Sequence, residues 1–151
     1  MTTSRLKTLR TNLVTDIQTQ LTADGVTDVT VTPYPVLADQ WTREDRVWLG
    51  TITGEQEPLT QGPNGKREET LTVELTVYAP TFGGTEEEQA AGEGRAETIF
   101  ASVETAVRTD ITVNNTVFDV NVESYESNPA YVDADGPVGM FTAELVAEAH
   151  I

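Results

Sequence analysis

The sequence contains no cysteine, and its only histidine is His150. The absence of cysteine excludes disulfides, thiol nucleophiles, iron–sulfur clusters and cysteine-type zinc sites. One histidine cannot provide two imidazoles for a metal, and no second one exists to form a Ser–His or Cys–His dyad elsewhere in the chain. We therefore expect the protein to use no cofactor and no resident metal ion.

Lysine is scarce, occurring only at Lys7 and Lys66, whereas carboxylates run along the whole chain. The 9 basic residues stand against 25 acidic ones, which gives a formal net charge of −16. Because binding to duplex DNA and to anionic membranes depends largely on basic side chains, we expect the protein to bind neither. This composition is typical of halophilic proteins, but an ordinary acidic protein from a GC-rich genome would share it. Composition leaves both interpretations open.

Long apolar runs are also absent. No stretch of about 18 apolar residues could form a transmembrane helix, and no apolar segment follows the basic N-terminus as in a signal peptide. We therefore expect a soluble protein made in the cytoplasm. The hydrophobic fraction is 38%, below the globular average of about 45–50%, but these residues fall into periodic runs. We expect one folded domain, residues 1–151, with a thin core.

Two segments have the spacing of amphipathic helices. The first runs from about residue 4 to residue 22, with leucine and isoleucine at steps of three and four. The second starts near Glu86, after the capping residue Thr85, and ends near Arg108. Gly92 and Gly94 weaken its first half, where they favour close packing or a kink.

Alternation of apolar and polar residues predicts the strands. It is clearest from Leu71 to Tyr78, where every second residue is apolar and would share one buried face. The other expected strands cover residues 29–31, 46–53, 111–113, 117–125 and 140–149. Segments 54–66 and 126–139 contain Gly, Pro and carboxylates, so we expect long exposed loops there. The order α-β-β-β-α-β-β predicts an α+β fold, a mostly antiparallel sheet with two helices packed on one face.

Carboxylate patterns resemble functional sites, but each departs from what its chemistry needs. Asp133-Ala134-Asp135-Gly136 is similar to the start of a calcium loop, yet Val138 occupies the sixth position, where the EF-hand turn needs glycine. A weak cation site at Asp133 and Asp135 stays open. The glutamates at 86–88, and Glu55 with Glu57, lack a buried aromatic pocket that would raise a carboxyl pKa. We therefore expect no catalytic residues and no enzyme activity.

The first ten residues hold three of the nine basic side chains, Arg5, Lys7 and Arg10. They lie at the start of a predicted helix, where the helix dipole disfavours cations. In so acidic a chain they are candidates for a subunit interface, pairing with carboxylates of a neighbouring copy. A solvated helix start is the alternative interpretation.

Four segments follow one another in an order that is typical of a known family. They are the N-terminal amphipathic helix, Trp48-Leu49-Gly50, Arg67-Glu68-Glu69-Thr70-Leu71-Thr72-Val73, and the helix 88–108 with Arg95-Ala96, Ile99 and Val103-Glu104, followed by Asp110. Together they resemble the tail terminator, or tail-completion, proteins of long-tailed, siphovirus-like viruses. The resemblance covers most of the chain up to about Asp110 and rests on packing patterns rather than on a signature motif.

The resemblance implies a small α+β virion protein that forms a ring, expected to be a homohexamer, on the last ring of the tail tube. Such a ring ends tube polymerisation and joins the tail to the head. Its implied partners are further copies of the chain, the tail tube protein and the head–tail connector protein. It would be assembled in the host cytoplasm and lie at the head-proximal end of the tail. The family offers no catalytic residues to carry over.

Viral DNA would slide through the opening of this ring without specific binding, because a carboxylate lining offers phosphates no cation. Glu55 and Glu57, in the loop expected at 54–66, are the candidates for that lining. Two alternatives remain. One is another head–tail joining or tail-tube protein. The other, from a different class, is a small acidic binding module or DNA-mimic inhibitor, for which a monomer or dimer is expected; a carboxylate hydrolase is a more distant alternative.

Overall fold

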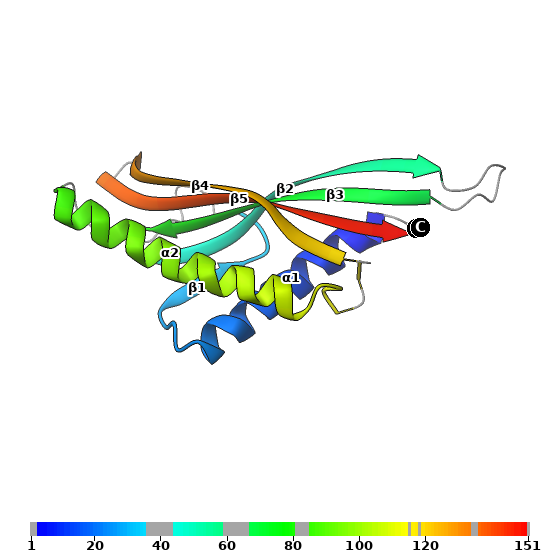
Figure 1. Cartoon of the computed structure of the whole chain (residues 1–151), viewed down its shortest axis with the longest axis horizontal. Helices are drawn as coiled ribbons and strands as arrows, with labels where there is room; N and C mark the ends of the chain where they lie inside the picture. Colours follow the sequence, from blue (N-terminus) through cyan, green and yellow to red (C-terminus); the bar gives the residue numbers. More distant parts are fainter. Residues whose placement is uncertain are drawn as a thin grey trace.

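Two helices lie on one side of a five-stranded sheet, as the computed structural model shows (Figure 1). The structure describes residues 3–35, 44–58, 67–80, 85–114, 116–117, 119–133 and 136–150. The elements are α1 (Thr3–Ala23), β1 (Val29–Thr32), β2 (Asp45–Pro58), β3 (Arg67–Ala79), α2 (Glu86–Thr109), β4 (Asp119–Asp133) and β5 (Gly136–His150). The sheet order is β1-β2-β3-β5-β4, and only β1 and β2 pair in parallel. The predicted α+β fold and element order are confirmed.

Helix α1 buries the face that its spacing predicts, with Leu9, Leu13, Ile17 and Leu21 at most 1% exposed. It ends at Ala23, and Gly25, two residues further on, has a φ of 70°, the left-handed conformation that glycine adopts without strain. The amide of Val26 then donates to the carbonyl of Leu21 at 2.9 Å, which closes the last turn. In the described part of the chain, no helix is both long and apolar enough to cross a membrane.

Helix α2 begins where the capping residue Thr85 was predicted. The Thr85 hydroxyl accepts the Glu88 amide at 3.2 Å and donates to the Glu88 carboxylate at 2.8 Å. Three glutamates lie in the first turn and Arg108 in the last, so both ends complement the helix dipole. The buried stripe of α2, including Ile99, Phe100 and Val103, packs in one core with the alternating apolar residues of β3. This agrees with the expectation that the helices pack on one face of the sheet (Figure 1).

A glycine pair brings α2 against β5. A Cβ added to Gly139 would lie 2.6 Å from the carbonyl oxygen of Gly92, so the helix backbone rests directly on the strand. Gly92 is buried, in agreement with the close-packing interpretation. Gly94 has no such role, because a Cβ there would meet nothing within 4 Å.

The two expected long loops are wrong where the structure describes them. Strand β2 continues to Pro58 and pairs with β3 as far as Arg67, so residues 54–58 are strand; residues 59–66 lie outside the described residues. Strands β4 and β5 likewise continue into the expected 126–139 loop and end with Asp133 opposite Gly136. Pairing with a neighbouring strand satisfies their backbone groups and overrides the weak local propensity. Pro129 is tolerated because it falls in a register shift on an edge strand.

The strand expected at 111–113 is also wrong. Residues 111–114 form turns after α2, and Val113 and Asn114 have φ angles of 48° and 54°. The Asn114 amide donates to the Asp110 carboxylate at 2.8 Å, which holds this turn. Val113 is 0% exposed, so burial of its side chain offsets the strain of a left-handed β-branched residue. The next strand, β4, accordingly begins at Asp119 rather than at Val117.

Gly139, where an added Cβ would meet the α2 backbone, and Gly94, where it would meet nothing, give a paired test of the packing between α2 and β5. Gly139→Ala should destabilise the fold by about 1–3 kcal/mol, because the added methyl would overlap the α2 backbone. Gly94→Ala should stabilise it by about 0.5–1 kcal/mol, because alanine costs less backbone entropy in an open helical position. Urea unfolding of the two variants measures both changes. Equal effects of the two substitutions would contradict the Gly92–Gly139 contact.

Candidate functional site: an acidic sheet face

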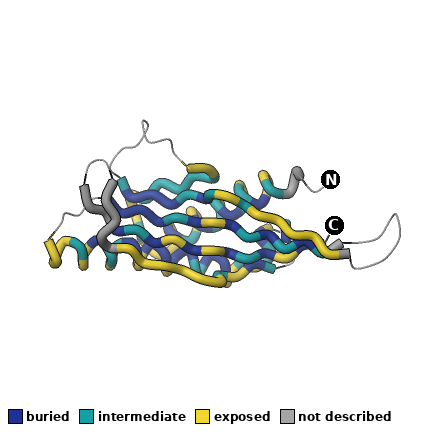
Figure 2. The backbone as a smooth tube through the Cα atoms, turned by 90° about the horizontal axis from the view of Figure 1, so that it is seen from above, coloured by how far each residue is buried: buried dark blue, intermediate teal, exposed yellow. Residues whose placement is uncertain are grey.

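The side of the sheet opposite the helices is polar. Along β3, Leu71, Val73 and Leu75 point to the core, so Thr72 and Glu74 between them point to the other side. The strand register continues this alternation onto the neighbouring strands (Figure 2). We call this side the open face.

Carboxylates dominate the open face. Eight whose side chains the structure describes occupy positions that the register places on it: Glu55, Glu57, Glu68, Glu74, Asp119, Glu126, Glu144 and Glu148. Among the described side chains of this face, Arg46 is the only basic one, and it forms an ion pair with Glu44. The open face therefore carries a strong negative charge that its own described cations do not neutralise.

Two glutamate pairs lie directly opposite each other across neighbouring strands. Glu57 faces Glu68 between β2 and β3, and Glu74 faces Glu144 between β3 and β5. Like charges at directly opposite positions destabilise a sheet. Because these glutamate pairs destabilise the sheet, they do not serve folding. Their negative charge therefore points to a functional role.

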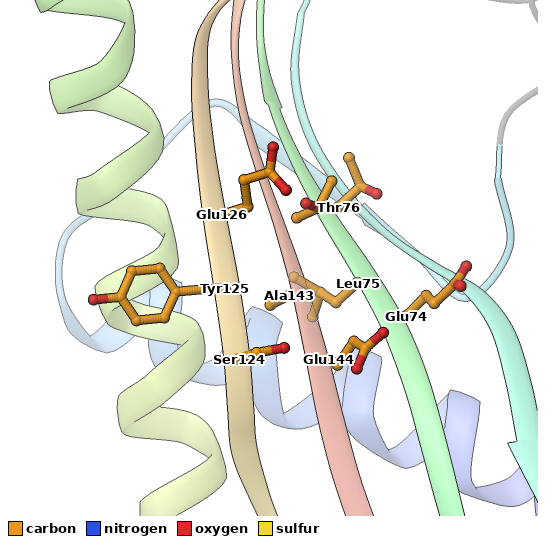
Figure 3. Close-up of a pocket in the computed structure, with 9 residues that line it drawn as sticks. Glu74, Leu75, Thr76, Ser124, Tyr125, Glu126, Ala143 and Glu144 are labelled. Carbon is orange, nitrogen blue, oxygen red and sulfur yellow. The ribbon is translucent and has the colours of Figure 1, made fainter.

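A hollow of about 500 Å³ lies on the open face across β3, β5 and β4. Figure 3 shows Glu74, Glu144 and Glu126 coming from these three strands, while Tyr125 lies on the α2 side. Threonines and Ser124 complete the polar lining. Across the residues that the structure describes, no three Asp, Glu or His side chains are grouped to hold a metal ion.

The lining candidates Glu55 and Glu57 are exposed, as expected, but they lie in strand β2 rather than in a loop. The structure thereby joins them to the other carboxylates of the open face. The other carboxylates of this face could not be identified from the sequence. Alternation along β3 and β5 shows which residues of one strand share a side, but it does not show the register that aligns one strand with the next.

The basic candidates have different surroundings. Arg10 donates to the carbonyls of Pro33 and Leu49 at 3.0 and 3.4 Å, and its guanidinium lies 4.8 Å from the centre of the Tyr34 ring. Lys7, one turn earlier in α1, is exposed. The side chain of Arg5 lies outside the described residues. Arg10 therefore has an intramolecular role, and the interface role of the cluster stays a prediction. The side chains of Asp133 and Asp135, the possible cation ligands, also lie outside the described residues.

A pair of carboxyl groups joins α1 to the end of α2, far from the open face. Burial raises the pKa of Asp16 to about 7, and the hydrogen bond and negative charge of Asp110 add to the rise. Burial also acts to raise the pKa of Asp110, but hydrogen bonds from Asp16, Asn114 and Thr112 outweigh it and lower that pKa. Below about pH 7, Asp16 is therefore mostly protonated, and its hydroxyl can donate a hydrogen bond to the Asp110 carboxylate.

The chain matches no family model, and no curated protein is significantly similar to it.

The Asp16–Asp110 pair predicts a pH dependence of stability. Because the pKa of Asp16 rises from 3.8 to about 7 on folding, its contribution is most favourable at low pH and is lost as the pH rises towards 7. Folding lowers the pKa of Asp110 instead, so its contribution to stability is lost as the pH falls into the acidic range. Asp16→Asn keeps a donor that cannot lose its proton. We expect this variant to melt higher than the wild type at pH 8 and by a smaller margin at pH 5, because the contribution of Asp16 is already lost in part above pH 3.8.

The control is Asp28→Asn, which removes the same charge from an exposed position whose φ of 62° asparagine also tolerates. Thermal melts of the three proteins at both pH values decide the matter. A parallel gain for Asp16→Asn and Asp28→Asn would show that only net charge matters.

The opposed glutamates predict a salt dependence. Glu74→Gln should stabilise the protein by about 0.2–1 kcal/mol at low salt, because it removes the repulsion with Glu144. The gain should vanish in molar KCl, where screening relieves the wild type. The control is Glu123→Gln, since Glu123 lies in a register shift and has no residue directly opposite. A wild-type melting temperature that stays flat or falls with KCl would contradict the account and the halophilic interpretation.

Proposed function

We propose that this chain is a structural virion protein that closes into a ring at the head-proximal end of a viral tail. In this role it ends polymerisation of the tail tube and joins the tail to the head connector. The observation that carries the proposal is the open face, where eight carboxylates lie on one side of one sheet. The resemblance of the N-terminal two thirds of the chain to tail terminator proteins supports the same role.

An acidic face of this kind suits the wall of a channel for DNA. Phosphates that pass a carboxylate surface find no cation to bind, so the genome can slide without being held. The repulsion between Glu74 and Glu144 then has a use, since it keeps negative charge dense where DNA passes. We accordingly place the open face, including Glu55 and Glu57, on the inner side of the ring.

The surroundings of the carboxylates favour a structural role over a catalytic one. Six of the eight carboxylates of the open face are exposed, and Glu68 and Asp119 are half-buried. A catalytic carboxylic acid is typically enclosed in an apolar pocket that raises its pKa. We therefore propose that the protein acts without enzyme activity or cofactor, through contacts with its own copies, the tail tube protein and the connector protein.

A DNA-mimic inhibitor is the second candidate, and the open face also favours it, because such a protein presents carboxylates in place of phosphates. The two functions differ in assembly. A mimic acts as a monomer or dimer, whereas a terminator forms a closed ring that does not grow. A tail-tube protein would instead stack its rings into tubes.

Electron microscopy and light scattering of the purified protein test the proposal. We expect closed rings of uniform size that do not stack, and no shift of duplex DNA at physiological salt. A protein that stays monomeric at high concentration, or that binds DNA tightly, would overturn the terminator function.

Charge reversal tests the position of the open face. Glu74→Lys combined with Glu148→Lys, on the two inner strands β3 and β5, should leave the ring intact and make it retain duplex DNA, because the channel wall then carries cations. The control makes the same change of charge on α2, with Glu87→Lys and Glu97→Lys, both at exposed positions. Equal DNA retention by both variants would show that the open face does not line the channel.

A further inference from the structure

The sheet has an unpaired edge on each side. Strand β4 pairs with β5 on one side only, and no described strand lies beyond it. On the other side of the sheet, β1 pairs with β2 only from Asp45 to Trp48. The outer edge of β2 from Gly50 to Pro58 therefore has no described strand paired with it. Unpaired strand edges present backbone donors and acceptors that another chain can use.

The first half of β4, from Asp119, lies level with the unpaired stretch of β2 when positions are followed across the sheet. Following the register through β5 and β3, Asp119 is level with Glu55 and Val122 is level with Ile52. The other half of β4 contains Pro129 and a register shift, which blunt an edge, and it is level with the part of β2 that β1 already covers. The two free stretches therefore occupy the same half of the sheet.

Apolar groups accompany the β4 edge. Tyr125 is 64% exposed, yet its ring is held by Phe141 and Phe100, with ring centres 6.2 and 5.5 Å away. Ile111 is 49% exposed and lies at a hollow of about 300 Å³ between α2 and β4, which Val107, Val120 and Val122 also line. A rigidly held, exposed aromatic ring beside an apolar groove is typical of a protein contact.

The opposite edge has complementary groups. Arg10 lies where β1 ends, bound to the carbonyl of Leu49, and Tyr34 beside it is 51% exposed. Tyr125 is level with Leu49 across the sheet, so in a neighbouring copy it would reach this arginine and tyrosine. The charges also match, because Arg10 lies at the β2 edge whereas Glu123 lies in the register shift of β4.

We infer that the β4 edge of one copy, with its groove against α2, docks on the β2 edge of the next copy between Gly50 and Pro58. Successive antiparallel pairings make β4 run antiparallel to β2, so this contact continues the sheet as an antiparallel ladder with all open faces on one side. The two surfaces differ, so the contact is heterologous and propagates around an axis. The inference rests on the proposed ring and names its interface.

Engineered cysteines test this contact cleanly because the chain has none of its own. Asn121 on β4 and Thr53 on β2 are level across the sheet and both exposed. Within one copy three strand spacings separate them, about 14 Å, which is too far for a disulfide. Between docked copies they would be neighbours.

Oxidised Asn121→Cys/Thr53→Cys should give a ladder of covalent oligomers that ends at the ring, whereas Asn121→Cys/Glu55→Cys, whose second cysteine is two residues out of level, should crosslink far less. Either single variant should remain uncrosslinked. The control is Asn121→Cys/Thr98→Cys, whose second cysteine lies on the exposed side of α2. Rings seen by electron microscopy without any crosslink would overturn this interface while leaving the proposed function in place. Absence of both rings and crosslinks would overturn the two together.

A second variant tests the apolar part of the contact. Tyr125→Lys should raise the concentration needed for half-assembly roughly tenfold or more, because it removes a central aromatic anchor. The matched control is Thr98→Lys. Melting curves at low concentration show that both variants fold. An unchanged assembly concentration for Tyr125→Lys would contradict the docking surface.

Discussion

The packing of α2 against the centre of the sheet is the constraint on which the rest of the structure depends. It buries every second residue of β3 and β5, and the Gly92–Gly139 contact sets how closely helix and strand approach. Because both helices lie on this side, no described helix covers the alternate residues (Figure 1). That side can therefore carry charges that a two-sided core would exclude.

The carboxylates to which we assign a function lie on one side of the sheet, and the groups that stabilise the fold lie on the other. The opposed glutamates weaken the sheet on the open face, while the aliphatic core and the caps of α2 stabilise it from the other side. Because the pKa of Asp16 is raised to about 7, the Asp16–Asp110 pair carries one negative charge rather than two below that pH, where α1 meets the end of α2. The proposed sheet continuation would repeat this division in each copy, with one acidic surface facing the axis and the helices outside.

Local signals in the sequence predicted the helices because caps and a 3.6-residue period are properties of neighbouring residues. The same kind of signal failed for residues 54–58 and 126–133, where glycine, proline and glutamate favour loops but pairing with β3 and β5 decides. It also failed at Val113, which two alternating residues placed in a strand and which the Asp110 cap holds in a turn. Glu55 and Glu57 could be identified as candidates from the sequence. The other carboxylates of the open face could not, because strand register brings together residues that are distant in sequence, such as Glu74 and Glu144.

We propose that copies of this chain close into a ring whose inner wall is the open face. The structure of the assembled protein, determined by electron cryomicroscopy, tests this most directly. We expect a closed ring in which Glu74 and Glu144 face the axis, with β4 of each copy beside β2 of the next. A ring with the open face turned outwards, or a monomer with that face exposed on its own, would contradict it.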